Sequence, residues 1–155
     1  MKKILTALCL TALLTACSDN EVGDVSLGMF TTQDIKLNIL KDDIVSGVTC
    51  HIASIEENLS FSDPSDSSIS CRQTGEITKD MIAQIDKSKS GEVVFKKSKS
   101  IFFKTMKIRR IFDADNQTLM YVSYSTKETS GSFKHSLSTV PLWGTKAYVE
   151  PTPAQ

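Results

Sequence analysis

The feature that most limits how this chain can fold is a pair of cysteines set in two short alternating segments. Cys50 lies in the run Val-Thr-Cys-His-Ile that starts at Val48, and Cys71 lies in the run Ile-Ser-Cys-Arg that starts at Ile69. Apolar and polar residues alternate in both runs, which is typical of a strand with one buried face. Each cysteine falls on the apolar side, so a bond between the two sulfurs would join two strands from inside the fold.

The N-terminus resembles a bacterial export signal. A positive start, Met1-Lys2-Lys3, precedes an apolar run over residues 4–14 that is too short to span a bilayer as a mature helix. The run ends in Leu-Thr-Ala-Cys, which looks like the lipobox of bacterial lipoproteins, where the cysteine, here Cys17, is acylated. We expect a lipoprotein-type signal peptide over residues 1–16 and lipid on Cys17. The alternative is an ordinary signal with a chance cysteine near the cut.

The residues after the cut indicate where the lipid would be held. Ser18, and not an aspartate, follows Cys17, which by resemblance to the sorting of Gram-negative lipoproteins favours the outer membrane. Residues 17–24 are polar and predict a short lipidated tether. Stable attachment takes more than one acyl chain, and the folded domain then needs no membrane surface of its own. Without lipid on Cys17 the protein would be soluble in the periplasm.

Export also decides the fate of the cysteines. Cys9 would leave with the signal and Cys17 would carry lipid, so Cys50 and Cys71 would remain together in an oxidising compartment. We expect them to form a disulfide that closes a loop of about twenty residues. The alternative, a catalytic thiol pair, needs a Cys-x-x-Cys spacing that the sequence lacks.

The remaining chain predicts one mainly β domain. Removal of the signal leaves 139 residues with ordinary globular composition, enough for one core. Alternation predicts strands at residues 25–30 and 35–40 and a strand-rich region over 92–126. Turn residues are frequent and helical crossovers are few, so we expect an antiparallel sandwich or a partly open barrel. We place this domain at residues 25–145 and a flexible tail at 146–155.

One helix is expected. Residues 78–88 carry a possible N-cap at Thr78, an aspartate in the first turn and a narrow apolar stripe. The stripe consists of Met81, Ile82 and Ile85. A helix of this kind would lie on the surface of a sheet.

Charge divides the mature chain into two halves of opposite sign. Residues 18–80 hold 12 acidic and 4 basic residues, whereas residues 81–155 hold 6 acidic and 12 basic residues. Many of the cations lie close to phenylalanines between Phe95 and Phe112. In a cytoplasmic protein this mixture would suggest nucleic acid, but behind an export signal it favours anionic envelope lipid, a glycan or the domain's own acidic half.

Two of these cations fall among apolar neighbours. If Met106, Ile108 and Phe112 share one strand face, then Lys104 and Arg110 share it too, and buried charges need partners. An anion pocket floored by Lys104 and Arg110, with Lys96 and Lys97 beside it, is one interpretation. The alternatives are a β-bulge that flips the register before Met106, and side chains that extend to solvent at the sheet edge.

The sequence shows no strong catalytic or metal-binding pattern. His51 alternates outward from Cys50, and His135 would not reach Ser136 from an extended strand. Lys134 and Ser136 would share a face, which leaves a lysine-serine nucleophilic pair as a weak alternative because no hydrolase signature supports it. Two histidines and no thiolate cluster make zinc and haem sites unexpected. We therefore expect no cofactor, no metal and no catalytic residue.

Several of these motifs resemble the CreA family of small exported bacterial proteins whose biochemical role is not established. The resemblance covers most of residues 48–141, including Val-Thr-Cys at Val48, Ile-Ser-Cys at Ile69 and the run Gly-Glu-Val-Val-Phe-Lys-Lys at Gly91. Further matches follow at fixed spacing: Phe103-Lys104, Arg110, Asp113-Ala114, Leu119, Tyr121, Tyr124-Ser125, Gly131-Ser132, Lys134, Ser138 and Val140-Pro141. The resemblance implies an exported envelope domain with a disulfide and supplies no catalytic residue. The lipobox departs from the plain cleavable signal of the family, which puts a freely soluble periplasmic protein in doubt.

The functional expectation combines these points. We expect a non-enzymatic envelope lipoprotein that contacts the membrane through lipid on Cys17 and binds an anionic envelope ligand or a protein partner, but no nucleic acid. Lys96, Lys97, Lys104 and Arg110 are the expected ligand-binding residues. The alternatives are a hydrolase that uses Ser136 with Lys134, and a purely structural domain whose basic stretch only complements its acidic half.

Overall fold

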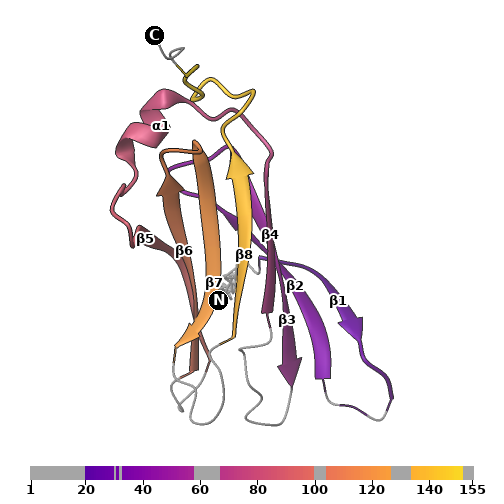
Figure 1. Ribbon diagram of the computed structural model, residues 1–155. Coiled ribbons are helices and arrows are strands. Elements are labelled where there is room, and N and C mark those ends of the chain that lie inside the picture. Colours follow the sequence, from indigo (N-terminus) through magenta and orange to yellow (C-terminus); the bar gives the residue numbers. More distant parts are fainter. Residues whose placement is uncertain are drawn as a thin grey trace, which may run out of the picture.

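The chain folds into two layers of strands with one short helix (Figure 1). The computed structural model describes residues 20–29, 31, 33–57, 67–99, 104–126 and 134–151. Their elements are β1 (Glu21–Ser26), β2 (Gln33–Lys41), β3 (Val48–Glu57), β4 (Ser67–Gln73), α1 (Lys79–Gln84), β5 (Glu92–Lys99), β6 (Lys104–Asp113), β7 (Thr118–Thr126) and β8 (His135–Pro141). The predicted signal peptide and Cys17 lie outside these residues. No helix of the described chain has the length and apolar character needed to cross a membrane.

The strands pair in chain order. β1 to β4 form a first antiparallel sheet, and β5 to β8 form a second. β4 packs across β7 and β8, where the Cys71 N–H donates to Ser138 Oγ at 2.7 Å and the Ser67 and Ser123 hydroxyls lie 3.1 Å apart. The two sheets stay separate and do not close on one another. The predicted mainly antiparallel β fold with one short helix is confirmed, in its sandwich form.

The core lies between the sheets and contains the disulfide. Cys50 on β3 is directly opposite Cys71 on β4, and both are buried. The bond between them confirms the pairing and inward orientation expected from alternation. Residues from both sheets and from the connecting segments complete the core, among them Val45, Val48, Ile52, Ile77, Ile108, Leu119 and Leu142.

The first strand differs from its prediction. It covers Glu21–Ser26 instead of residues 25–30, so part of the expected tether is paired with β2. β1 is an edge strand whose valines, Val22 and Val25, remain exposed, and its pattern therefore carries little alternation to detect. Gly28, with a φ of 125°, lies just beyond its end.

The helix begins where predicted and ends early. Thr78 is the N-cap and accepts a hydrogen bond from the Met81 N–H at 3.4 Å, as its side chain predicted. The backbone becomes extended at Ile85, three residues before the expected end. Asp86 follows, and its side chain accepts from the Ser88 N–H at 2.7 Å. This local turn competes with helix continuation, which explains why the helix stops.

The segment after β8 is packed further than expected. Ala147 is 4% exposed, although a flexible tail was predicted from residue 146. Val149 exchanges two hydrogen bonds with the Gln117 side chain, at 2.7 and 2.8 Å. Lys146 forms an ion pair with Glu76 at 2.5 Å, and the segment covers the same end of the sheets as α1 (Figure 1). Turn and side-chain hydrogen bonds hold this segment in place, and they leave no apolar periodicity in the sequence, so the packing was not predicted.

The disulfide should contribute a large share of the stability. Replacing both Cys50 and Cys71 by alanine should lower the free energy of unfolding by about 3 kcal/mol, because the bond closes a loop of 21 residues in the unfolded chain. Urea denaturation of the oxidised protein and of the double variant measures this. A variant of equal stability would contradict the prediction, as would free thiols in protein purified from its native host.

Candidate functional site

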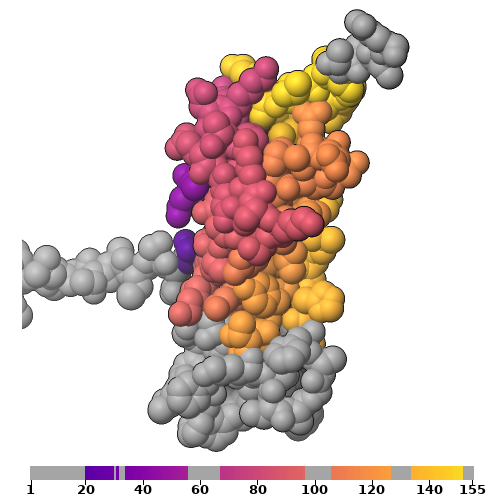
Figure 2. Space-filling model, turned by 60° about the vertical axis from the view of Figure 1, so that its left-hand side comes forward, coloured from indigo at the N-terminus to yellow at the C-terminus, as the bar shows by residue number. Residues whose placement is uncertain are grey.

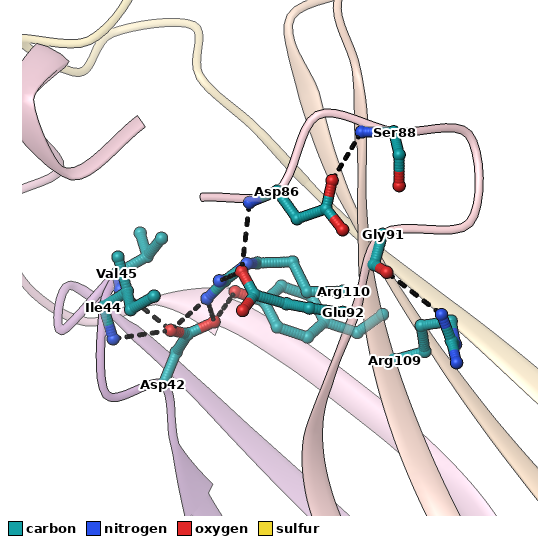
Figure 3. Close-up of polar contacts among 10 residues, drawn as sticks. Asp42, Ile44, Val45, Asp86, Ser88, Gly91, Glu92, Arg109 and Arg110 are labelled. Atoms are coloured by element: carbon teal, nitrogen blue, oxygen red, sulfur yellow. Dashed lines mark hydrogen bonds and ion pairs between the residues drawn. The ribbon is translucent and has the colours of Figure 1, made fainter. Parts of the chain in front are cut away.

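The most unusual group in the core is a buried arginine held between two carboxylates (Figure 3). Arg110 on β6 is 1% exposed, and its Nη1 donates to both carboxylate oxygens of Asp42. Its Nη2 donates to Glu92, whose side chain is partly exposed. The Tyr121 hydroxyl donates to Asp42 Oδ2 at 2.8 Å. We call Asp42, Glu92, Arg110 and Tyr121 the arginine cluster.

Strand pairing explains how the second sheet assembles three of these residues. Arg110 is directly opposite Glu92 of β5 and directly opposite Tyr121 of β7, so the three side chains form one row across the sheet. Gly91 lets β5 begin this close to β6, because a Cβ there would lie 1.9 Å from the Arg110 carbonyl oxygen. Its φ of 56° also favours glycine.

Asp42 reaches the row from the first sheet. It follows the end of β2, and its Oδ1 accepts from the backbone N–H groups of Ile44 and Val45, at 3.0 and 2.8 Å. This Asx turn fixes the carboxylate so that it points across the sandwich toward Arg110 (Figure 3). The arginine cluster therefore links the two sheets by a charged contact.

The environment sets the protonation states of the cluster. Burial alone would raise the pKa of Asp42, but hydrogen bonds from Arg110, the Val45 N–H and Tyr121 outweigh it and hold that pKa below its ordinary value. Burial would lower the pKa of Arg110, whereas its bonds and charge contacts with Asp42 and Glu92 raise it overall. Burial and the neighbouring Asp42 charge raise the pKa of the Tyr121 hydroxyl. Near neutral pH the cluster thus holds a charged pair and a neutral tyrosine.

This geometry leaves Arg110 little capacity for a ligand. Both terminal nitrogens of Arg110 donate to internal carboxylates. Of the three guanidinium nitrogens, only Nε lacks a hydrogen-bond partner among the described residues. Met106, Ile108 and Arg110 are all buried on the inner face of β6, as alternation predicted, and no register shift separates β6 from β7. The predicted need for partners is met from inside the protein. The arrangement can join the sheets, and it presents no open anion pocket.

Of the other predicted binding residues, Lys96 is exposed on the outer side of β5, directly opposite Lys107. In the strand register Lys97 is opposite Met106 and Lys104 is opposite Lys99, and the side chains of both lysines lie outside the described part of the structure. Lys96 does not converge with Arg110, which faces the core.

Three cations gather instead on the outer side of the second sheet. Lys96 and Lys107 are cross-strand neighbours, and Arg109 lies on the same side of β6 as Lys107. Arg109 Nη1 donates to the Ser90 and Gly91 carbonyls, at 2.8 and 3.0 Å, and its Nε lies 3.4 Å from the Tyr124 hydroxyl. We call Lys96, Lys107 and Arg109 the basic face. Figure 2 shows the edge of the second sheet formed by β5, which lies next to this face.

A groove lies at the edge of the sandwich where β1 and β5 are the outermost strands of the two sheets. It has a volume of about 580 Å³ and runs between the β1–β2 side of the first sheet and β5. Its lining is Asn20, Val22, Ile39, Leu40, Lys41, Asp43, Val94 and Phe95. Lys41 and Asp43 give it one charge of each sign, so it does not select an anion by charge.

The residues weighed for catalysis do not form an activated pair. Ser136 Oγ is buried and has no hydrogen-bond partner among the described residues, so Lys134 does not contact it. A nucleophilic serine needs a base within hydrogen-bond reach. His51 and His135 sit on strands β3 and β8. The described chain contains no group of three histidine, cysteine, aspartate or glutamate residues placed to hold a metal ion.

Sequence reasoning missed the partners of Arg110. The signal that would have found them is the aspartate pair Asp42-Asp43 directly after an alternating strand, together with a glutamate at the start of the paired strand. Neither position is unusual by itself, because both residue types are common at strand ends. Only the register of β5 on β6 makes Glu92 a neighbour of Arg110.

The fold and cluster define a class: a disulfide-linked sandwich of two consecutive four-stranded meanders joined by a buried carboxylate–arginine contact. Comparison with known proteins identifies the family. The family described as "CreA protein" matches residues 22–145, and this chain belongs to it. It is 37% identical over 115 residues to Protein CreA of Escherichia coli strain K12, covering 70% of this chain and 72% of the relative. Protein CreA of Escherichia coli O157:H7 matches equally. No solved structure shows a significant match.

The arginine cluster should make stability depend on acid. Because the folded pKa of Asp42 is lowered, its contribution is complete above the ordinary aspartate pKa of about 3.9 and is lost as pH falls through the lower folded value. Asp42→Asn should cost about 3–5 kcal/mol at pH 7, since it leaves Arg110 buried with one charge partner fewer. The variant should also lose less further stability below about pH 4 than the unmodified protein.

Urea denaturation across this pH range measures both effects, and the neighbouring exposed Asp43 provides the matched control. Asp43→Asn removes the same charge one residue away and should change the free energy of unfolding by less than about 0.5 kcal/mol. Equal effects of the two substitutions would show that the buried contact contributes nothing special.

Proposed function

We propose that this CreA-family protein is a non-catalytic lipoprotein of the cell envelope that binds an anionic ligand through the basic face. The observation that carries the proposal is the direct cross-strand placement of Lys96 opposite Lys107. Like charges in this position destabilise a sheet. An anionic group bound over both side chains would remove the repulsion.

The distribution of charge between the sheets supports ligand binding over a purely structural role. The acidic half of the sequence contains β1 to β4, and the basic half contains β5 to β8. From the basic stretch, Arg110 meets the acidic half through Asp42. Lys96 and Lys107 point to the other side of the second sheet and have no ion pair within the described residues. Their charge is therefore left for an external partner.

The surroundings of the basic face suit an extended ligand. Leu137 on β8 is 57% exposed and lies in register with Val122 of β7, which in turn pairs with Arg109. Cations thus stand beside apolar surface on one side of one sheet. A lipid or glycan that carries phosphate or carboxylate groups next to apolar or ring surface would match both features.

The proposed location follows from the cysteines. A buried disulfide between Cys50 and Cys71 is typical of proteins that fold in an oxidising compartment. The lipobox-like sequence before Cys17 favours a periplasmic protein held at the outer membrane by lipid. β1 begins only four residues after Cys17, so the tether that we propose is short and would hold the domain close to the lipid surface.

Binding can be tested with vesicles that contain phosphatidylglycerol in a phosphatidylcholine background, and with a soluble anionic polysaccharide. A Lys96→Gln/Lys107→Gln variant should bind about thirtyfold more weakly, since each surface cation near an anionic surface contributes about 1 kcal/mol. Binding of the unmodified protein should also weaken with added salt. Cosedimentation and titration calorimetry measure these effects.

The control for this experiment is Lys79→Gln/Lys87→Gln, which removes the same charge from exposed positions outside the basic face. It should bind almost as the unmodified protein does. If both double variants weaken binding equally, binding depends on net charge alone, and the basic face is not the site. If the protein binds neither anionic probe but captures an anionic protein, the proposed ligand would be a protein partner and not a lipid or glycan.

Lipid attachment has its own test. The mature protein from its native host should begin at Cys17, with the added mass of two or three acyl chains, and should fractionate with the outer membrane. Replacement of residues 1–16 by an ordinary cleavable signal, together with Cys17→Ser, should shift it to the soluble periplasmic fraction with an unchanged disulfide. An unmodified mature terminus in the wild-type protein would contradict the lipoprotein assignment and leave the binding proposal intact.

A further inference from the structure

An exposed tryptophan, Trp143, lies against the half-buried Tyr148 in the segment that follows β8. Trp143 is 70% exposed, which is unusual for the largest apolar side chain. Its ring meets that of Tyr148 at a centroid distance of 4.9 Å and an angle of 73°. A notch of about 400 Å³ is lined by Trp143, Gly144, Thr145, Tyr148 and Glu150. Packing of the core does not account for Trp143, because its neighbour Leu142 already fills the interior.

The backbone under the notch is firmly held. Thr145 bonds the Leu142 carbonyl through both its N–H, at 2.9 Å, and its hydroxyl, at 2.7 Å. Val149 is bonded on both sides by the Gln117 side chain, and Leu142 and Ala147 are buried on either side of the turn. Such a segment keeps its two rings in place before any ligand arrives, which reduces the entropic cost of binding.

The notch combines aromatic faces with negative charge. The two rings pack edge to face and both line the notch, so the ring surface that this contact leaves uncovered forms two adjoining walls with the negative potential of a π system. Glu150 adds an exposed carboxylate to the lining. The nearby cation of the chain, Lys146, is engaged with Glu76. Gly144 has no neighbour within 4 Å of where a Cβ would stand, so that side of the notch is open.

We propose that the notch formed by Trp143, Tyr148 and Glu150 binds an organic ammonium group. Alkylated ammonium ions are attracted to aromatic faces, and the attraction is stronger where the aromatic surface excludes water. The carboxylate of Glu150 adds a negative charge that complements the ammonium group. The site is independent of the basic face, since it selects the opposite charge at another part of the molecule. The ammonium group has two possible sources: a small soluble cation or the head group of a zwitterionic lipid.

The sequence offers a direct probe, because Trp143 is its only tryptophan. Choline and tetramethylammonium should change its fluorescence emission saturably, with a dissociation constant in the range of about 1–10 mM, as befits an exposed site. The neutral isostere 3,3-dimethylbutan-1-ol and matched sodium chloride should not. Phosphatidylcholine vesicles form a second arm: a head-group ligand predicts a larger change per choline, reversed by free choline.

Two substitutions keep the probe and remove one wall each. Glu150→Gln and Tyr148→Leu should each weaken choline binding about threefold to tenfold. Asp24→Asn, which removes an exposed carboxylate from β1, should leave it unchanged. Thermal unfolding must match across the variants, and because Tyr148 also contacts the core, Glu150→Gln decides the matter if Tyr148→Leu is destabilised.

Two results would overturn the site. The first is no saturable change with choline up to about 100 mM, a concentration that would detect even a very weak cation–π contact. The second is an equal response to the neutral isostere, which would indicate simple apolar contact. If free choline binds saturably but does not reverse the vesicle response, Trp143 inserts into lipid without recognising the head group, and the site is assigned to a small soluble cation.

Discussion

The contact between Asp42 and Arg110 is the interaction on which the relation of the two sheets depends. Each sheet is a meander whose neighbouring strands pair in chain order, and the apolar core between the sheets is non-directional. A buried charge pair, in contrast, is directional, because it offsets the cost of desolvation only with good geometry and satisfied hydrogen bonds. Because Tyr121 and Glu92 complete the hydrogen bonding, the cluster specifies which residues of the two layers face each other.

The same contact divides the molecule by charge. It joins the acidic first sheet to the basic second sheet at one buried point, whereas Lys96, Lys107 and Arg109 lie on the outer side of the second sheet. Arg110 and Arg109 are adjacent in sequence and have opposite roles, since one crosses the core and the other faces outward. A single basic stretch thereby serves both cohesion and the proposed recognition.

Sequence patterns predicted features that depend on local periodicity and missed those that depend on register. The strand pair around Cys50 and Cys71, the cap at Thr78 and the inward side of Arg110 follow from neighbours within a few residues. The partners of Arg110 lie 68 and 18 residues away, where no local pattern points. The edge strand β1 and the packed turn around Ala147 were missed because exposed valines and turn hydrogen bonds leave no periodic signal.

The consecutive order of the strands has a consequence for how the chain acquires its shape. Every neighbour in the first sheet lies before residue 74, so that sheet and its disulfide can assemble before the second half of the chain is available. Until β6 joins, however, the Asp42 carboxylate lacks its Arg110 partner. The strands of the first half can thus be paired early, but their inner side stays exposed until the last third of the chain closes the interior.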